Sequence, residues 1–302
     1  MMVLTIGAIR HIEEVEKQIS LEFSKITPKA LIPTYTSIKK GEIDFLYYEI
    51  KDEVLAKNYN FFFSDAIKLY ASSSITEIIL EFVRFDIIKE ILEYKFPKYS
   101  HSEHSKIIYM IKSLLTENED NDDRESIYYS YRKEIMSMLM DFFEDSNEFV
   151  LEGFIQFRLQ EYKRNLEKII VYIIKEYEAQ KEYKEFLRLL KYFVDTQETK
   201  EETIHIVGSK EGRFRIYDKD KKDITERCEE EFEEDFKSKS DNYDDLLVST
   251  LITIAPRQIL IHHYELIQNK TLIETINNIF QGKVTICSTC EFCKNFHGNQ
   301  LT

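Results

Sequence analysis

The longest regular pattern of apolar positions lies between Asn147 and Gln197, a stretch with no proline and only one glycine. In its first part, apolar residues recur every three or four positions, the spacing of one face of an α-helix. These residues are Ile155, Leu159, Tyr162, Leu166, Ile169, Ile173 and Tyr177. A second stripe with helical spacing consists of Tyr183, Phe186, Leu187, Leu190 and Val194. The pattern predicts a long helical spine over residues 147–197.

The polar run Glu178–Glu182 separates the two stripes. One unbroken helix over the whole stretch would be ~75 Å long at ~1.5 Å per residue, too long for one compact domain. We therefore expect a spine of two consecutive helices with a break at Glu178–Glu182.

The chain before the spine changes its pattern once. Its first part predicts a strand at Met2–Ala8 and a helix at Arg10–Ile26. A hairpin is predicted from Leu31–Ile38 and Ile43–Ile50. Helical spacing then predicts helices at Val54–Phe96, Ser102–Leu115 and Ile127–Phe143. Asp145, Ser146 and Asn147 are N-cap residue types that would start the spine. We interpret residues 1–52 as a small N-terminal α/β unit and residues 53–146 as a helical region.

Short segments rich in β-formers return after the spine. Thr203–Val207 and Arg213–Tyr217 predict a hairpin, and Gln258–His262 and Lys283–Cys287 predict two strands with a helical pattern between them. A crossover of this length joins parallel neighbours, so we expect a βαβ unit within a small mixed sheet. Residues 198–293 would form this C-terminal α+β domain and residues 294–302 a tail. The predicted class is α+β and predominantly helical.

Composition narrows the class of protein. The chain of 302 residues is 43% hydrophobic and 13% aromatic, which indicates a folded protein. Its net charge of −14 weighs against nucleic acid as the main partner, because phosphate binding requires a concentrated basic surface. The longest apolar run of the spine, Ile169–Ile174, is far shorter than the ~18 residues of a membrane span. The N-terminus lacks the features of a signal peptide. We expect a soluble, cytoplasmic protein in a reducing compartment.

The sharpest chemical signal is Cys287-x-x-Cys290-x-x-Cys293. Cysteines two residues apart around a turn can direct their thiolates to one metal ion. A zinc site or an iron–sulfur cluster requires about four ligands, and we expect zinc rather than a cluster. The candidates for the fourth ligand are His262, His263, His297 and Cys228. The alternative is a reduced cysteine-rich tail, or a dithiol that forms a transient disulfide.

The predicted parallel strands make the geometry of this motif testable. The last strand would end beside the strand that carries His262 and His263, at the sheet edge where ligands generally bind. Neighbouring strand residues point to opposite faces, so at most one of these histidines can face the cysteines. We expect at least two of the three sulfurs within about 4–5 Å of each other. His205, on another predicted strand, is expected to be a packed, hydrogen-bonded residue.

The sequence contains no recognisable catalytic constellation. It has no G-x-S-x-G, Walker loop, dinucleotide fingerprint or H-E-x-x-H motif, and we assign no catalytic or cofactor-binding residues beyond the metal candidates. The segment Glu226–Asp245 contains ten acids and three bases, and the acidic helix expected at Thr225–Asp235 is a candidate surface for a basic protein partner. Such charge runs are commonly solvated faces, so the identity of a partner is left open.

Five segments in the second half of the chain form a specific series. They are EGFIQFRLQEY (Glu152–Tyr162), KEYKEFLRLLKYFVDTQE (Lys181–Glu198), IHIV (Ile204–Val207), DNYDDLLVSTLITIAP (Asp241–Pro256) and FQGKVTICSTCEFC (Phe280–Cys293). In this order they resemble the YtxC-like sporulation proteins of endospore-forming Firmicutes. The resemblance implies a cytosolic protein linked to sporulation, in the mother cell or the forespore, with no assigned enzymatic activity.

Two functions follow as hypotheses. In the first, the chain is a non-catalytic interaction or scaffold factor whose cysteine motif is stabilised by zinc. In the second, it is a redox- or metal-dependent enzyme or sensor that uses the three cysteines.

Overall fold

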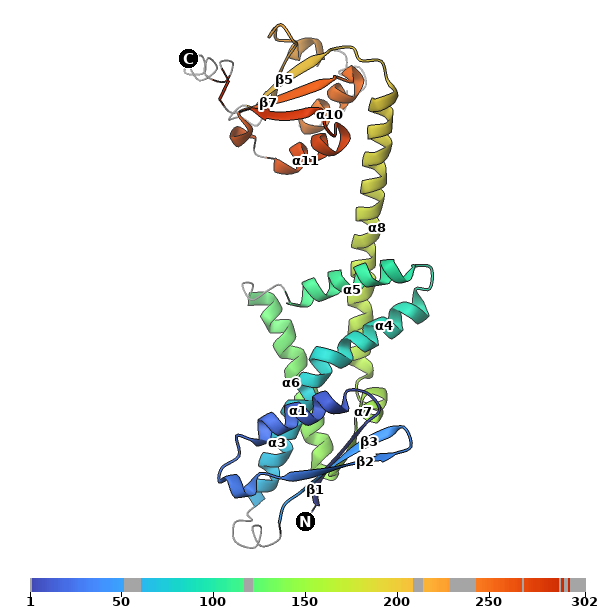
Figure 1. Ribbon diagram of the computed structural model, residues 1–302, viewed down its shortest axis with the longest axis vertical. Helices are drawn as coiled ribbons and strands as arrows, with labels where there is room; N and C mark the ends of the chain where they lie inside the picture. Colours follow the sequence, from blue (N-terminus) through green and yellow to red (C-terminus); the bar gives the residue numbers. More distant parts are fainter. Residues whose placement is uncertain are drawn as a thin grey trace. The chain divides into compact units, whose positions relative to one another are not determined.

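The computed structural model describes residues 2–51, 61–116, 122–208, 214–228, 243–267, 269–287, 289–290 and 293. Within these residues the chain is mostly helical and contains two four-stranded sheets, which confirms the predicted α+β class. The chain divides into unit 1, Met1–Tyr177, and unit 2, Glu178–Thr302 (Figure 1). Among the described residues, no helix combines the length and apolar content needed to cross a membrane.

Unit 1 contains a sheet whose strands come from distant parts of the chain. Its strand order is β2-β3-β1-β4. The strands are β1 (Met2–Ala8), β2 (Thr34–Lys40), β3 (Ile43–Glu49) and β4 (Glu148–Val150). β3 pairs antiparallel with both β2 and β1, which confirms the predicted hairpin, and β4 pairs parallel with β1. β4 was missed because three residues are too few to show an alternating pattern.

The helices of unit 1 share one apolar core with this sheet. They are α1 (Ile12–Phe23), α3 (Phe61–Ile78), a π-helical segment (Ile79–Val83), α4 (Arg84–Lys95), α5 (His101–Thr116), α6 (Asp122–Asp145), α7 (Leu151–Phe157) and the first part of α8 (Gln160–Thr196). α5 starts with a reciprocal cap: Ser100 N donates to Glu103 Oε2 at 2.9 Å, and Glu103 N donates to Ser100 Oγ at 3.3 Å.

The spine has two helices, but the predicted break at Glu178–Glu182 was wrong. α7 ends at Phe157, and α8 continues from Gln160 to Thr196. The polar run consists of good helix formers, so the backbone remains helical there without a buried face. It coincides instead with the division between the units: Leu166 belongs to the core of unit 1, and Val194 to the core of unit 2.

Unit 2 contains the second sheet, with strand order β6-β5-β7-β8. The strands are β5 (Thr203–Gly208), β6 (Phe214–Tyr217), β7 (Gln258–His262) and β8 (Val284–Cys287). β5 and β6 form the predicted antiparallel hairpin, whereas β7 pairs parallel with β5 and with β8. α11 (Lys270–Ile279) connects β7 to β8, which confirms the predicted βαβ unit with parallel strands. Figure 1 also shows α10 (Tyr243–Ile254) beside this sheet.

The two faces of the second sheet differ in chemistry. Ile204, Ile206, Ile259 and Ile261 are fully buried and belong to the same apolar core as residues of α8, α10 and α11. Because strand side chains alternate between faces, His205, which lies between Ile204 and Ile206, and His262, which follows Ile261, lie on the opposite face. The helices therefore cover one face, and the candidate metal ligands belong to the other.

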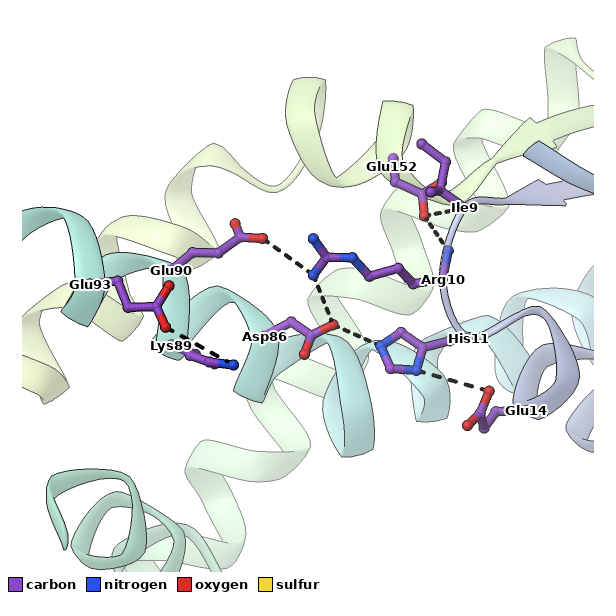
Figure 2. Close-up of polar contacts among 9 residues, drawn as sticks. All are labelled: Ile9, Arg10, His11, Glu14, Asp86, Lys89, Glu90, Glu93 and Glu152. Carbon is purple, nitrogen blue, oxygen red and sulfur yellow. Dashed lines mark hydrogen bonds and ion pairs between the residues drawn. The ribbon is translucent and has the colours of Figure 1, made fainter. Parts of the chain in front are cut away.

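Polar contacts join the connection between β1 and α1 to two distant helices of unit 1 (Figure 2). Oε1 of Glu152, in α7, accepts hydrogen bonds from the backbone N–H groups of Ile9 and Arg10 at 2.8 and 3.1 Å. His11 has left-handed backbone geometry, with φ 62°, and its Nε2 lies 2.8 Å from Oδ2 of Asp86 in α4. These contacts hold the end of β1 against segments more than seventy residues away in the sequence.

We expect Leu166→Asp or Ile173→Asp to unfold unit 1. The two side chains are 1% and 5% exposed, and burying an unpaired carboxylate costs several kcal/mol, against a total stability of about 5–15 kcal/mol for a domain. Circular dichroism during heating should show a lost or strongly lowered transition, or the protein should be insoluble. Val171→Asp, on the exposed side of the same helix, is the control. Unchanged melting of both core variants would contradict the packing of α8.

We expect Glu152→Ala to lower the free energy of unfolding of unit 1 by about 1–3 kcal/mol, because hydrogen bonds to a charged group are lost. Chemical denaturation followed by circular dichroism measures this change. Glu152→Gln, which keeps an acceptor oxygen, should lose less. Glu176→Ala, at an exposed position of α8, is the control and should be nearly neutral. Equal stability of Glu152→Ala and Glu176→Ala would show that the Glu152 hydrogen bonds drawn in Figure 2 contribute nothing.

Candidate metal centre

The candidate site lies where two parallel strands of unit 2 end. His262 is the last residue of β7, Cys287 is the last residue of β8, and the two are paired in register. Cys290 and Cys293 follow β8 directly in the sequence. The sheet therefore positions two of the four candidate ligands, and the C-x-x-C-x-x-C spacing brings the other two close to them.

The three sulfurs and one imidazole nitrogen form a compact group. Sγ of Cys293 lies 3.5 Å from Sγ of Cys290 and 3.9 Å from Sγ of Cys287. Nδ1 of His262 lies 3.1 Å from the Cys293 sulfur and 3.7 Å from the Cys290 sulfur. All four ligand atoms lie within 4.8 Å of one another. The expected convergence of at least two sulfurs is confirmed, and all four cysteines of the chain are free thiols.

These distances can be compared with the geometry of a mononuclear site. Ligand bonds of about 2.0–2.3 Å at tetrahedral angles place the donor atoms about 3.5–3.8 Å apart. The observed separations of 3.1, 3.5, 3.7 and 3.9 Å lie close to this range. The donor set therefore fits one tetrahedral metal ion with small movements of the side chains.

Burial keeps His262 and Cys293 in their neutral forms. Cys293 and His262 are 1% and 2% exposed, whereas Cys287 and Cys290 are partly exposed. Burial, helped by the neighbouring His205 and His263, lowers the pKa of His262 to about 4. Burial, together with hydrogen bonds to Cys290 and Cys287, raises the pKa of the Cys293 thiol to about 12. At neutral pH the imidazole is uncharged and can offer a lone pair to a metal, whereas the Cys293 thiol must first lose its proton.

The other candidates for the fourth ligand lie elsewhere. His263 is buried beside the site, but it is outside the four-atom group and its Nδ1 lies 3.5 Å from Oε1 of Glu265. Cys228 is buried in the apolar core of unit 2 and is also outside the group. His297 lies outside the described residues. Of the two adjacent histidines, only His262 joins the cysteines, and His263 follows the end of β7 with left-handed backbone geometry, φ 53°.

Sequence reasoning missed the relation of His205 to this site. Nδ1 of His205 lies 3.0 Å from Nε2 of His262, and the two rings are within 21° of parallel. Its ring is packed and hydrogen-bonded, as expected for a strand histidine. The sequence signal was the position of His205 two residues before Val207. Val207 pairs with His262, and strand residues two apart share a face, so His205 lies on the same face as His262. That signal can be used only once the register between β5 and β7 is known.

Comparison with known proteins places the chain in a family. The family model described as "YtxC-like family" matches residues 69–285, which include His205 and His262 and end two residues before Cys287. The chain is 22% identical over 221 residues to the "Uncharacterized protein YtxC" of Bacillus subtilis (strain 168), and the alignment covers 72% of this chain and 76% of that protein. No solved structure matches the chain. Because the family model spans well over half of the chain, this protein belongs to the YtxC-like family.

Proposed function

We propose that this protein is a non-catalytic, cytosolic factor of sporulation that acts through protein contacts and carries one structural zinc ion in unit 2. The observation that supports the zinc site is the group of four donor atoms within 4.8 Å. The link to sporulation and to the cytosol follows from the resemblance to the YtxC-like sporulation proteins. The acidic segment Thr225–Asp235, of which residues 229–235 lie outside the described residues, is proposed to bind a basic protein partner.

The donor chemistry favours zinc over the other metal centres. Thiolate and imidazole ligands in a tetrahedral arrangement are typical of zinc. In a [4Fe–4S] cluster each cysteine binds a different iron atom, which spreads the cysteine sulfurs around the cluster. Here the Cys293 sulfur lies within 3.9 Å of both other sulfurs, so the three point to a common centre. This arrangement suits one ion better than a cluster.

The number of ligands favours a structural role over a catalytic one. Catalytic zinc sites keep one coordination position for water or substrate, whereas structural sites have four protein ligands. Three thiolates and Nδ1 of His262 would fill all four positions. The ion would join the end of β7 to the edge strand β8 and to the cysteines that follow it.

The same geometry supports a second candidate function, a redox sensor. The sulfurs of Cys290 and Cys293 are 3.5 Å apart in a C-x-x-C motif, and Cys290 is partly exposed. Oxidation of these two thiols to a disulfide by a peroxide would remove two ligands from the metal. A sensor would release zinc under mild oxidation, whereas a purely structural site would keep it.

We expect the purified full-length chain to contain one zinc ion per molecule, measured by elemental analysis. Cys293→Ser and His262→Ala should each weaken zinc binding strongly, and a chelator should lower the melting temperature of unit 2 because structural zinc contributes to folding. Cys228→Ser is the matched control, since this buried cysteine lies outside the group. Cobalt substitution tests the closed site: added azide should leave the cobalt spectrum unchanged.

Three results would overturn this proposal. The first is a wild-type protein that contains no zinc and takes up none. The second is a brown protein that absorbs near about 400 nm, which would indicate an iron–sulfur cluster. The third is a cobalt spectrum that shifts with azide, which would indicate an open position and support the enzyme hypothesis.

We expect zinc affinity to rise with pH. The metal must displace the proton of Cys293, whose pKa is about 12, whereas His262, with a pKa of about 4, is already neutral above pH 6. Each displaced proton makes the apparent affinity rise about tenfold per pH unit, so the increase from pH 6 to pH 7 should be at least about tenfold. Competition titration against a chelator, corrected for its own protonation, measures this change. An affinity independent of pH would contradict the protonated state of Cys293.

A further inference from the structure

His262 uses its two ring nitrogens for different neighbours. Nδ1 lies 3.1 and 3.7 Å from the sulfurs of Cys293 and Cys290. Nε2 lies on the other side of the ring, 3.0 Å from Nδ1 of His205. Only Nδ1 can therefore bind a metal held by the cysteines, and Nε2 is committed to His205.

This division determines where the proton of His262 must be. A neutral imidazole has one N–H group and one lone pair, and a metal at Nδ1 requires the lone pair there. The proton then belongs to Nε2, and its hydrogen bond needs an acceptor at His205. Nδ1 of His205 meets this need when the proton of its own ring is on Nε2. The opposite tautomer of His262 would direct N–H toward the sulfurs and could not bind the metal.

The fold holds His205 rigidly in this position. Its backbone is paired on both sides, antiparallel with Tyr217 and parallel with Leu260. The His205 and His262 side chains are 8% and 2% exposed, so bulk water has little access to the contact between them. A histidine lying on a well-paired central strand can therefore orient the ligand more precisely than a loop residue could.

Charge explains why a histidine suits this position. Zinc with three thiolates and one neutral imidazole carries a net charge of −1, because the thiolates outweigh the ion. A carboxylate, a common partner of metal-bound histidine, would add a second negative charge in a buried place. A neutral imidazole supplies the acceptor without adding charge.

We infer that His205 is a positioning residue of the metal centre: it accepts the Nε2–H hydrogen bond of His262 and so selects the tautomer that presents Nδ1 to the ion. This inference rests on the proposed zinc site and adds a residue that orients it. His205 itself does not contact the metal.

The test compares the zinc affinities of five full-length proteins: the wild type, three single variants and one double variant. His205→Phe removes the acceptor and keeps the ring volume, and we expect zinc binding about 10–100-fold weaker than in the wild type. His205→Asn places an amide oxygen near the position of Nδ1, and we expect it to recover most of the loss. His262→Cys replaces the imidazole with a thiolate, which has no tautomers and so needs no orienting hydrogen bond. We therefore expect the double variant His262→Cys/His205→Phe to bind zinc as tightly as His262→Cys alone.

Nitrogen-15 NMR of zinc-loaded protein provides a readout that a merely structural role would not change. In the wild type we expect His262 to show a metal-bound Nδ1 and a protonated Nε2 whose proton exchanges slowly with solvent. In His205→Phe that proton should exchange rapidly, because its acceptor is gone. This readout also decides the question if the His262→Cys protein binds no zinc.

The outcomes separate this inference from the proposed function. If the wild type binds no zinc, both the proposed zinc site and the role of His205 are overturned. If His205→Phe binds zinc as tightly as the wild type, only the role of His205 is overturned. An equal loss from His205→Phe in both the His262 and the His262→Cys backgrounds would show that His205 merely supports the fold, and would also overturn the inference.

Discussion

The parallel pairing of β7 with β8 places His262 directly beside Cys287, and the chemistry of unit 2 depends on this register. A slip of one residue would exchange the faces of all side chains on β8. The apolar face opposes such a slip, because Val284 of β8 packs on the same core as its partner Ile259. Packing on one face of the sheet therefore determines which side chains meet on the other.

The low polarity of that second face sets the protonation of the site. Burial favours uncharged groups, so His262 is a neutral imidazole and Cys293 a protonated thiol before any metal binds. Three converging cysteine sulfurs are a ready set of ligands for a soft metal ion. Such an ion would restore the charge balance that three thiolates alone could not have in a buried place.

Unit 1 illustrates the same dependence on distant partners. β4 exists because the edge of β1 offers unpaired backbone groups to a segment from residues 148–150. Glu152, shortly after it, then binds the backbone at the far end of β1 (Figure 2). α8 contributes side chains to two separate cores, with the polar run Glu178–Glu182 between them.

The local sequence pattern, meaning its hydrophobic periodicity, its β-formers and its cysteine spacing, predicted the helices, the hairpins, the βαβ unit and the cysteine motif, because each depends on residues close together in the sequence. It could not find β4, whose three residues become a strand only through pairing with β1. It misplaced the break in the spine, because loss of an apolar stripe ends a core but does not end the hydrogen bonds of a helix. The choice of His262 over His263 and Cys228, and the contact of His205 with it, required the register between strands. Local spacing determines which face a side chain occupies, whereas only the tertiary structure decides which side chain of another segment lies opposite, because that depends on pairing and packing between distant parts of the chain.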